Sequence, residues 1–207
     1  IACPAFPQNN RTIYNGYLFV DGVLLSESGM KDHPLTPMTD ANLVRVLSRQ
    51  TTHKVGLVDI NIVKQGSAAI REQFNSLQLS GFRHAIVDAI NPADLMSIGE
   101  ALKGMKLITG GSGIALGLPE NFRSNGGISG NTDAILPLVG GRSAVLAGSC
   151  SMTTRGQVAA AQVHWPSLSL NPFRFADSPE RGAKEALAWV DSQPSDAPVL
   201  IYSSADP

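Results

Sequence analysis

The chain has 207 residues, of which 43% are hydrophobic and 16% charged, so it is long enough to bury a substantial core. Its 16 basic and 17 acidic side chains give a formal net charge of -1, which provides no overall field to attract nucleic acid or an anionic membrane. No apolar run reaches the roughly 20 residues that a membrane-spanning helix needs. The composition therefore predicts a soluble globular protein with neither nucleic acid nor a membrane as partner.

The two cysteines, Cys3 and Cys150, are too few and too far apart for a disulfide framework. The four histidines lack the spacing of metal ligands, so we expect no metal site built by the protein itself. Two free thiols fit a reducing compartment, and we predict a cytoplasmic protein. The chain starts at Ile1 without a methionine and stops at Pro207 just after an apolar run, so we expect an internal piece of a longer protein.

The first predicted unit is a β-hairpin. Apolar and aromatic runs at 14–20 and 23–28 are separated by Asp21-Gly22, a dipeptide suited to a tight type I′ turn. The segment HPLTPM follows, and Thr39 or Asp40 is then expected to cap a helix whose apolar residues fall at 43, 44 and 47.

Strands and helices then alternate along the rest of the chain. Strands are predicted at 55–59, 84–89, 106–109, 143–147, near Leu168 and at 199–202, and helices at 67–79, after Asn91, at 153–164 and after Ser178. This order is typical of α/β proteins with largely parallel sheets flanked by helices. The stretch from about 120 to 141 is rich in Gly, Asn, Ser and Pro, so we predict two α/β domains, at 1–125 and 142–207, joined by a linker at 126–141.

The segment TGGSG, residues 109–113, directly follows a predicted strand. Glycines allow backbone N–H groups to converge on an anion, and Gly110, Gly111 and Ser112 are therefore candidate ligand contacts. The segment is neither a Walker loop nor a complete dinucleotide fingerprint. The alternative is a tight glycine turn at the end of a strand.

The segment GSCSMTTR, residues 148–155, lies between a predicted strand and the helix that follows it. Ligands of open α/β sheets bind beyond the carboxyl ends of strands, where helix N-termini attract phosphate. Four hydroxyl side chains, those of Ser149, Ser151, Thr153 and Thr154, precede Arg155, whose guanidinium can pair with phosphate. The alternative is ordinary N-capping, for which one hydroxyl is enough.

Cys150 offers a competing interpretation, because a thiol at a helix N-terminus can act as a nucleophile in a phosphatase-like or lyase-like enzyme. A phosphatase loop closes with a later arginine than Arg155, and a small buried packing cysteine is the plainer interpretation. Two polar loops supply further candidates: Arg11 could pair with a substrate carboxylate, and His33 and Thr36 could hold a hydroxy acid. A solvated arginine and a proline-rich turn are the alternatives.

Taken together, these segments resemble a known family. CPAFPQNNRT, YLFVDGVLLSES, MKDHPLTPMTDANLVRVL, VDAINPADL, LITGGSGIALGLP and AGSCSMTTRGQ are similar, in order, to successive signatures of the four-carbon acid sugar kinases, also called 3-oxo-tetronate kinases. The resemblance runs to about Val163 and corresponds to the middle portion of such kinases. It implies an amino-terminal domain that binds the acid sugar, up to about Pro119, and a carboxyl-terminal domain that binds ATP, from about Gly141.

The resemblance further implies transfer of the γ-phosphoryl group of ATP, with Mg²⁺, to the terminal hydroxyl of a 3-oxo-tetronate, threonate or erythronate. Ser149, and with it Ser151, Thr153 and Arg155, would contact ATP; Arg11, His33, Thr36, Gly110, Gly111 and Ser112 would line the acid-sugar cleft. The catalytic base stays unassigned. The family's aspartate-rich first loop and its Gly-Gly-Glu-Thr-Ser loop are absent from these residues, so we expect the chain alone to bind ATP weakly. A non-catalytic sugar-acid binding module stays open as an alternative, and a homodimer is compatible with the sequence.

Overall fold

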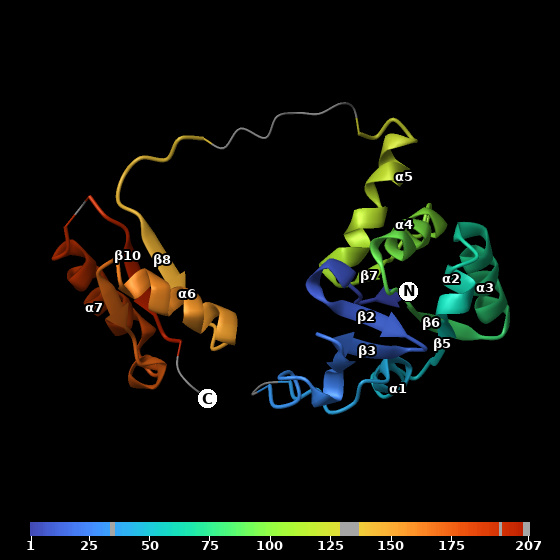
Figure 1. Ribbon diagram of the computed structural model, residues 1–207, viewed down its shortest axis with the longest axis horizontal. Helices are drawn as coiled ribbons and strands as arrows, with labels where there is room; N and C mark the ends of the chain where they lie inside the picture. Colours follow the sequence, from blue (N-terminus) through green and yellow to red (C-terminus); the bar gives the residue numbers. More distant parts are fainter. Residues whose placement is uncertain (34–35, 129–136, 195, 205–207) are drawn as a thin grey trace. The chain divides into compact units, whose positions relative to one another are not determined.

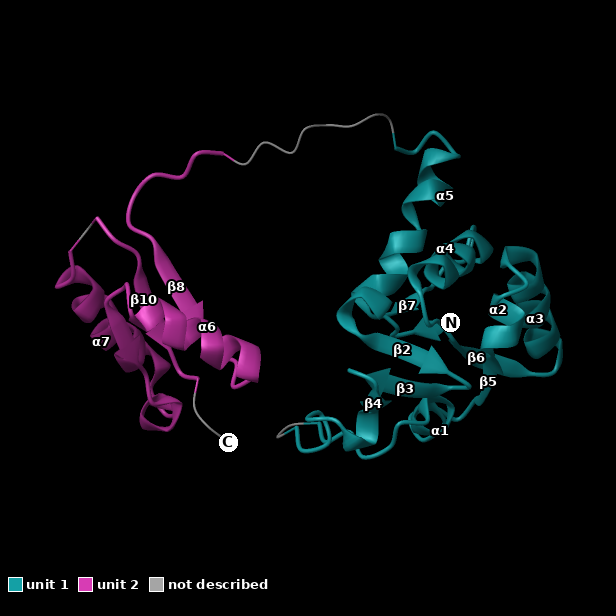
Figure 2. Ribbon diagram, viewed as in Figure 1, with its two compact units in different colours: residues 1–132 teal, residues 133–207 magenta. Residues whose placement is uncertain are grey.

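The computed structural model describes residues 1–33, 36–128, 137–194 and 196–204. Figure 2 shows that the chain divides into two compact units, Ile1–Thr132 and Asp133–Pro207. The proposed linker at 126–141 lies partly outside the described residues. Each unit contains a parallel sheet flanked by helices, so the predicted α/β class is confirmed. Within the described residues, no helix combines the length and the apolar character needed to cross a membrane.

The first unit is built on a four-stranded sheet in the order β5-β6-β1-β7 (Figure 1). Its strands are β1 (Ala2–Cys3), β5 (Lys54–Val58), β6 (Phe82–Val87) and β7 (Thr109–Gly110). All neighbouring strands run parallel, so their carboxyl ends meet at one edge. Strand β7 was predicted at 106–109 but lies further along the chain, because only Thr109 and Gly110 pair with β1.

Helices cover both faces of this sheet. The helices of this unit are α1 (Leu43–Ser48), α2 (Ile60–Val63), α3 (Ser67–Leu79), α4 (Pro92–Ala101) and α5 (Pro119–Arg123), with short 3₁₀ turns at Pro7–Asn9, Leu25–Glu27 and Ser112–Gly117. Gly56 faces Leu77 of α3, and the next residue, Leu57, lies with Val44 of α1 around Gly16. Successive strand residues point to opposite faces, so α1 and α3 lie on opposite sides. Burial on both faces explains why β5 and β6 are apolar in their carboxyl-terminal parts, at 55–58 and 85–87.

Local sequence signals set several of these helix boundaries. Helix α3 spans the predicted range, and α4 begins with a full capping box in which Asn91 and Asp94 each accept from the other's backbone N–H. The predicted cap of α1 was wrong. The side chain of Asn42 accepts from the N–H of Arg45, whereas Asp40 accepts from the N–H of Asn42 and binds the Arg45 guanidinium.

The first unit also contains an antiparallel sheet in the order β2-β3-β4, with strands at Arg11–Tyr14, Tyr17–Val20 and Val23–Leu24. The predicted Asp21-Gly22 turn is present, with positive φ at both residues. The predicted strand at 14–20 is wrong at its start, because Asn15-Gly16 makes another turn with positive φ. Backbone hydrogen bonds between Ile13 and Ala89 join this sheet to the loop after β6.

The second unit has a three-stranded parallel sheet in the order β8-β10-β9. Its strands are β8 (Ala144–Ala147), β9 (Ser167–Ser169) and β10 (Val199–Tyr202), and its helices are α6 (Met152–Gln162) and α7 (Pro179–Asp191), with a 3₁₀ turn at Pro172–Phe175. The predicted strand at 199–202 is confirmed. Helix α6 begins one residue earlier than predicted because Ser151 caps it.

Candidate functional site

In the first unit, polar groups gather where the parallel strands end. Asp59 follows β5, Asp88 follows β6, Pro4 follows β1 and Gly111 follows β7. The strands are parallel, so these four positions share the edge at which α/β sheets bind ligands. The two aspartates were not singled out from the sequence, although an aspartate directly after an apolar strand was the available signal.

Asp88 is fully buried and organises this edge. Its carboxylate accepts hydrogen bonds from the backbone N–H groups of Asn15 at 2.6 Å, Gly16 at 2.9 Å and Ile60 at 3.0 Å. Burial raises the pKa of Asp88, and the three backbone hydrogen bonds oppose that rise only in part. The carboxylate therefore fastens the β2–β3 turn and the start of α2 to the sheet, and is occupied by structural contacts.

Asp59 has a similar structural task at the end of β5. Its side chain accepts from the backbone N–H groups of Asn61 at 2.8 Å and Ile62 at 3.3 Å and so caps α2. Both aspartates thus bind main-chain donors of the fold.

The TGGSG loop packs closely against the segment after β1. A Cβ atom on Gly110 would lie 2.2 Å from the carbonyl oxygen of Cys3, and one on Gly113 would lie 2.3 Å from that of Ala5. The N–H of Thr109 donates to Ile1 and that of Gly111 donates to Cys3. The expectation of bare amides at this turn was therefore wrong for Thr109 and Gly111, and the glycines allow close backbone approach. Ser112 is exposed at the start of the 3₁₀ turn.

Arg11 is linked to the TGGSG loop through Phe6, which contacts both. The backbone of Phe6 exchanges hydrogen bonds with that of Arg11, and a Cβ atom on Gly113 would touch Phe6. The side chain of Arg11 is exposed. Arg11 and the predicted glycine loop therefore occupy one region of the first unit.

His33 and Thr36 lie elsewhere in this unit. They form a local pair, in which Nδ1 of His33 accepts from the N–H of Thr36 at 3.1 Å and lies 3.1 Å from its hydroxyl. Their loop follows β4, whereas Arg11 is on β2, and β3 lies between these two strands. The described contacts do not bring His33 or Thr36 together with Arg11.

In the second unit, the GSCS loop follows β8 at the carboxyl edge of the sheet and precedes α6. The hydroxyl of Ser151 accepts from the N–H of Thr154 at 3.2 Å, and that of Ser149 accepts from the N–H of Ser151 at 3.2 Å. Capping thus accounts for Ser151, while the hydroxyl of Ser149 keeps its own hydrogen to donate. Thr153 is exposed and Arg155 is half-buried. Cys150 is exposed, so the packing interpretation of this cysteine was wrong.

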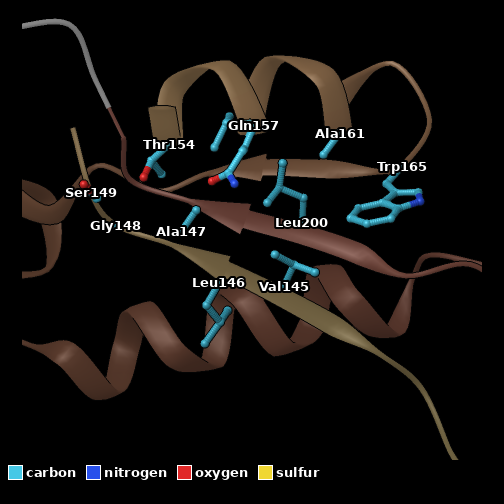
Figure 3. A pocket seen from close by; sticks show the side chains of 11 residues that line it. Val145, Leu146, Ala147, Gly148, Ser149, Thr154, Gln157, Ala161, Trp165 and Leu200 are labelled. Carbon is cyan, nitrogen blue, oxygen red and sulfur yellow. The ribbon is translucent and has the colours of Figure 1, made fainter. Parts of the chain in front are cut away.

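A cavity of about 540 Å³ extends from this loop along α6. Figure 3 shows Gly148, Ser149 and Thr154 at one end and Trp165 at the other, with Leu200 between them. Strand β8, strand β10 and α6 supply the lining, which is mainly apolar. The arrangement places hydroxyl groups at one end of an apolar cavity of the size that small ligands occupy.

Ser203 and Ser204 follow β10 at the same edge and were also missed. The N–H of Ser203 donates to the carbonyl of Ala147, and a Cβ atom on Gly148 would lie 3.6 Å from the Ser203 hydroxyl. The hydroxyl of Ser204 is buried and has no hydrogen-bond partner in the described chain. A pair of serines directly after an apolar strand was the sequence signal.

Comparison with known proteins identifies the family. Residues 1–118 match the model of a sugar-binding N-terminal domain, and residues 144–207 match that of a nucleotide-binding C-terminal domain. A 3-oxo-tetronate kinase from Burkholderia multivorans is 51% identical over 208 residues, which cover 100% of this chain and 48% of that protein. This chain belongs to the four-carbon acid sugar kinase family.

A further curated protein and two solved structures are also similar to this chain. A 3-oxo-tetronate kinase from Cupriavidus necator is also 51% identical, over 100% of this chain and 48% of its own length. A solved structure from Salmonella typhimurium LT2, described as a tRNA synthase, is 41% identical with a TM-score of 0.75, and covers 99% of this chain and 48% of its own. A Haemophilus influenzae protein of the family DUF1537 is 40% identical with a TM-score of 0.65, over 100% of this chain and 49% of its own. The chain spans about half the length of the curated relatives that it matches.

Proposed function

We propose that the whole protein is an ATP-dependent kinase that phosphorylates the terminal hydroxyl of a four-carbon acid sugar of the 3-oxo-tetronate or threonate type. The observation that carries this proposal is the GSCS loop, which follows a strand of a nucleotide-binding domain and opens into an apolar cavity. The names of the curated relatives point to the same acceptor.

The nucleotide would be held by the second unit. Ser149, Ser151, Thr153 and Arg155 surround the N-terminus of α6, which is 11 residues long and carries partial positive charge at that end. Phosphate oxygens would accept from the Ser149 hydroxyl and pair with the Arg155 guanidinium. The apolar part of the cavity, between Leu200 and Trp165, would accept the adenine ring.

The acid sugar would be held by the first unit. Arg11 is the proposed partner of the substrate carboxylate, with Gly110, Gly111 and Ser112 beside it, and His33 and Thr36 would contact the sugar from their own loop. Arg11 and Ser112 are exposed, whereas the carboxylates of Asp59 and Asp88 bind backbone donors. Phosphoryl transfer depends mainly on positioning and on charge stabilisation, which such groups supply.

Mg²⁺ would enter this chemistry with ATP. Among the described residues, no group of three or more His, Cys, Asp or Glu side chains converges to hold a metal ion. Kinase Mg²⁺ is commonly held by one or two carboxylates together with substrate phosphates, so a preformed protein cage is not required. The ion would neutralise charge on the phosphates.

The test is ADP release by the whole protein with Mg²⁺, ATP and either a 3-oxo-tetronate or threonate. We expect acid-sugar-dependent ADP release, and we expect Ser149→Ala to raise the KM for ATP by about tenfold, since one hydrogen bond to a charged group is lost. Ser192→Ala, which removes a hydroxyl at the end of α7, is the matched control and should leave KM unchanged. No ADP above background with any of these acceptors would refute the proposal.

Two rival functions give different results in the same assays. A cysteine-dependent phosphatase-like or lyase-like enzyme requires Cys150, which is exposed in the loop, whereas the kinase should keep its activity in Cys150→Ala. Acid-sugar binding in calorimetry, with no response to nucleotide, would favour a non-catalytic binding module.

A further inference from the structure

A second cavity lies in the first unit, between the antiparallel sheet and α1, and its lining is mainly polar. Its volume is about 510 Å³, and it is lined by Tyr17 of β3, Leu24 of β4, Ser26, the segment 39–41, Arg45 of α1, and Arg49 directly after α1. We call it the α1 pocket. None of the residues proposed above to bind ATP or the acid sugar lines it.

Three charged side chains form the polar wall of the α1 pocket. Asp40, whose side chain is 13% exposed, accepts from Nε of Arg45 at 2.7 Å and from its Nη2 at 2.6 Å. Arg49 approaches the same carboxylate through Nη1 at 3.3 Å, and its side chain is 66% exposed. Arg45 is therefore held as a two-point fork, whereas Arg49, which has five N–H donors, makes one longer contact with Asp40.

The charges of this wall do not cancel. Hydrogen bonds from the Arg45 side chain and the Asn42 backbone lower the pKa of Asp40 to about 2, so the carboxylate is ionised at neutral pH. Two positive charges facing one negative charge leave a net charge of +1, and no other charged side chain lines the pocket among the described residues.

We propose that the α1 pocket is a binding site for a small oxyanion of the carboxylate or phosphate class that also carries hydroxyl groups. Arg49 would pair with the anion while Asp40 holds both arginines in place, and the hydroxyls of Ser26 and Thr39 would bind the remaining polar groups of the ligand. The Tyr17 side chain, which hydrogen-bonds to Arg45, supports that arginine. The volume fits a molecule of metabolite size. This proposal does not depend on the kinase function, because it uses other residues.

The test is a backbone amide NMR titration of the 207-residue chain with inorganic phosphate and, separately, with threonate as a hydroxy acid. Sodium chloride at matched ionic strength corrects for screening. We expect saturable chemical-shift changes at the amides of Ser26 and Thr39. A response to phosphate alone identifies phosphate as the recognised group, a response to threonate alone identifies the carboxylate, and a response to both shows that the pocket accepts either oxyanion. Arg49→Gln should raise the apparent Kd by about tenfold or more. Arg123→Gln removes an equally exposed arginine from the salt bridge to Glu120 in α5 and should not change the Kd.

Arg49 is an exposed side chain directly after α1, and circular dichroism of Arg49→Gln verifies that the variant folds. If it does not fold, Ser26→Ala takes its place in the titration. Absence of saturable shifts at Ser26 and Thr39 with both probes would overturn the proposal and leave the cluster as a structural ion triad only. An Arg49→Gln variant that binds as tightly as the original chain would overturn it as well.

Discussion

Replacing Asp88 by alanine should destabilise the first unit strongly. Asp88 is fully buried and accepts from the backbone N–H groups of Asn15, Gly16 and Ile60. Alanine would leave three backbone donors without a partner, and each buried unpaired group costs about 1–3 kcal/mol. The lower limit, about 3 kcal/mol, is already a large share of the roughly 5–15 kcal/mol by which domains are stable.

Urea unfolding followed by far-UV circular dichroism measures this loss. Asp59→Ala is the matched control, because Asp59 also follows a strand of the same sheet but only caps the four-residue α2, and losing a cap costs about 1 kcal/mol. Both tryptophans, Trp165 and Trp189, belong to the second unit, so their fluorescence reports on that unit alone. The reasoning would be refuted if Asp88→Ala cost no more than Asp59→Ala.

Three further predictions concern the same unit. Gly110→Ala should cost about 1–3 kcal/mol in urea unfolding, because its Cβ would lie 2.2 Å from the carbonyl oxygen of Cys3, whereas Gly29→Ala, with open space around it, should be neutral. Asn91→Ala should cost about 1 kcal/mol through loss of the capping box of α4, and an unchanged midpoint would contradict this. Asp88→Asn should change the pH dependence of stability. Because the folded pKa of Asp88 is raised above its usual 3.8, the wild type should lose stability relative to the variant as pH rises from 3.8 through that raised value; parallel stability profiles would contradict it.

The candidate residues differ in how well sequence reasoning could place them. A loop between a strand and a capped helix is a local pattern, so the GSCS loop lies where it was expected, at the carboxyl edge of its sheet. TGGSG was expected to follow a strand, but its first two residues, Thr109 and Gly110, form β7 themselves. The function of its glycines depends on a partner segment more than 100 residues earlier, at Cys3–Ala5. No local pattern could reveal that the amide of Gly111 is already bonded to Cys3.

The amino-acid order alone determined the α/β class, helix α3, the Asn91 cap and strand β10, because periodicity, capping and turn chemistry act over a few residues. Only the tertiary structure decided that Asp88 is buried under the Asn15-Gly16 turn and that Asp40 binds two arginines instead of capping α1. Asn15 and Asp88 are distant in the chain and meet only when the sheet forms, whereas the two arginines that bind Asp40 follow it by five and nine residues. In both cases the folded backbone, and not the residue pattern, sets the partner of the carboxylate. For this reason the sequence points to the loops, while the fold decides which of their polar groups remain accessible to a ligand.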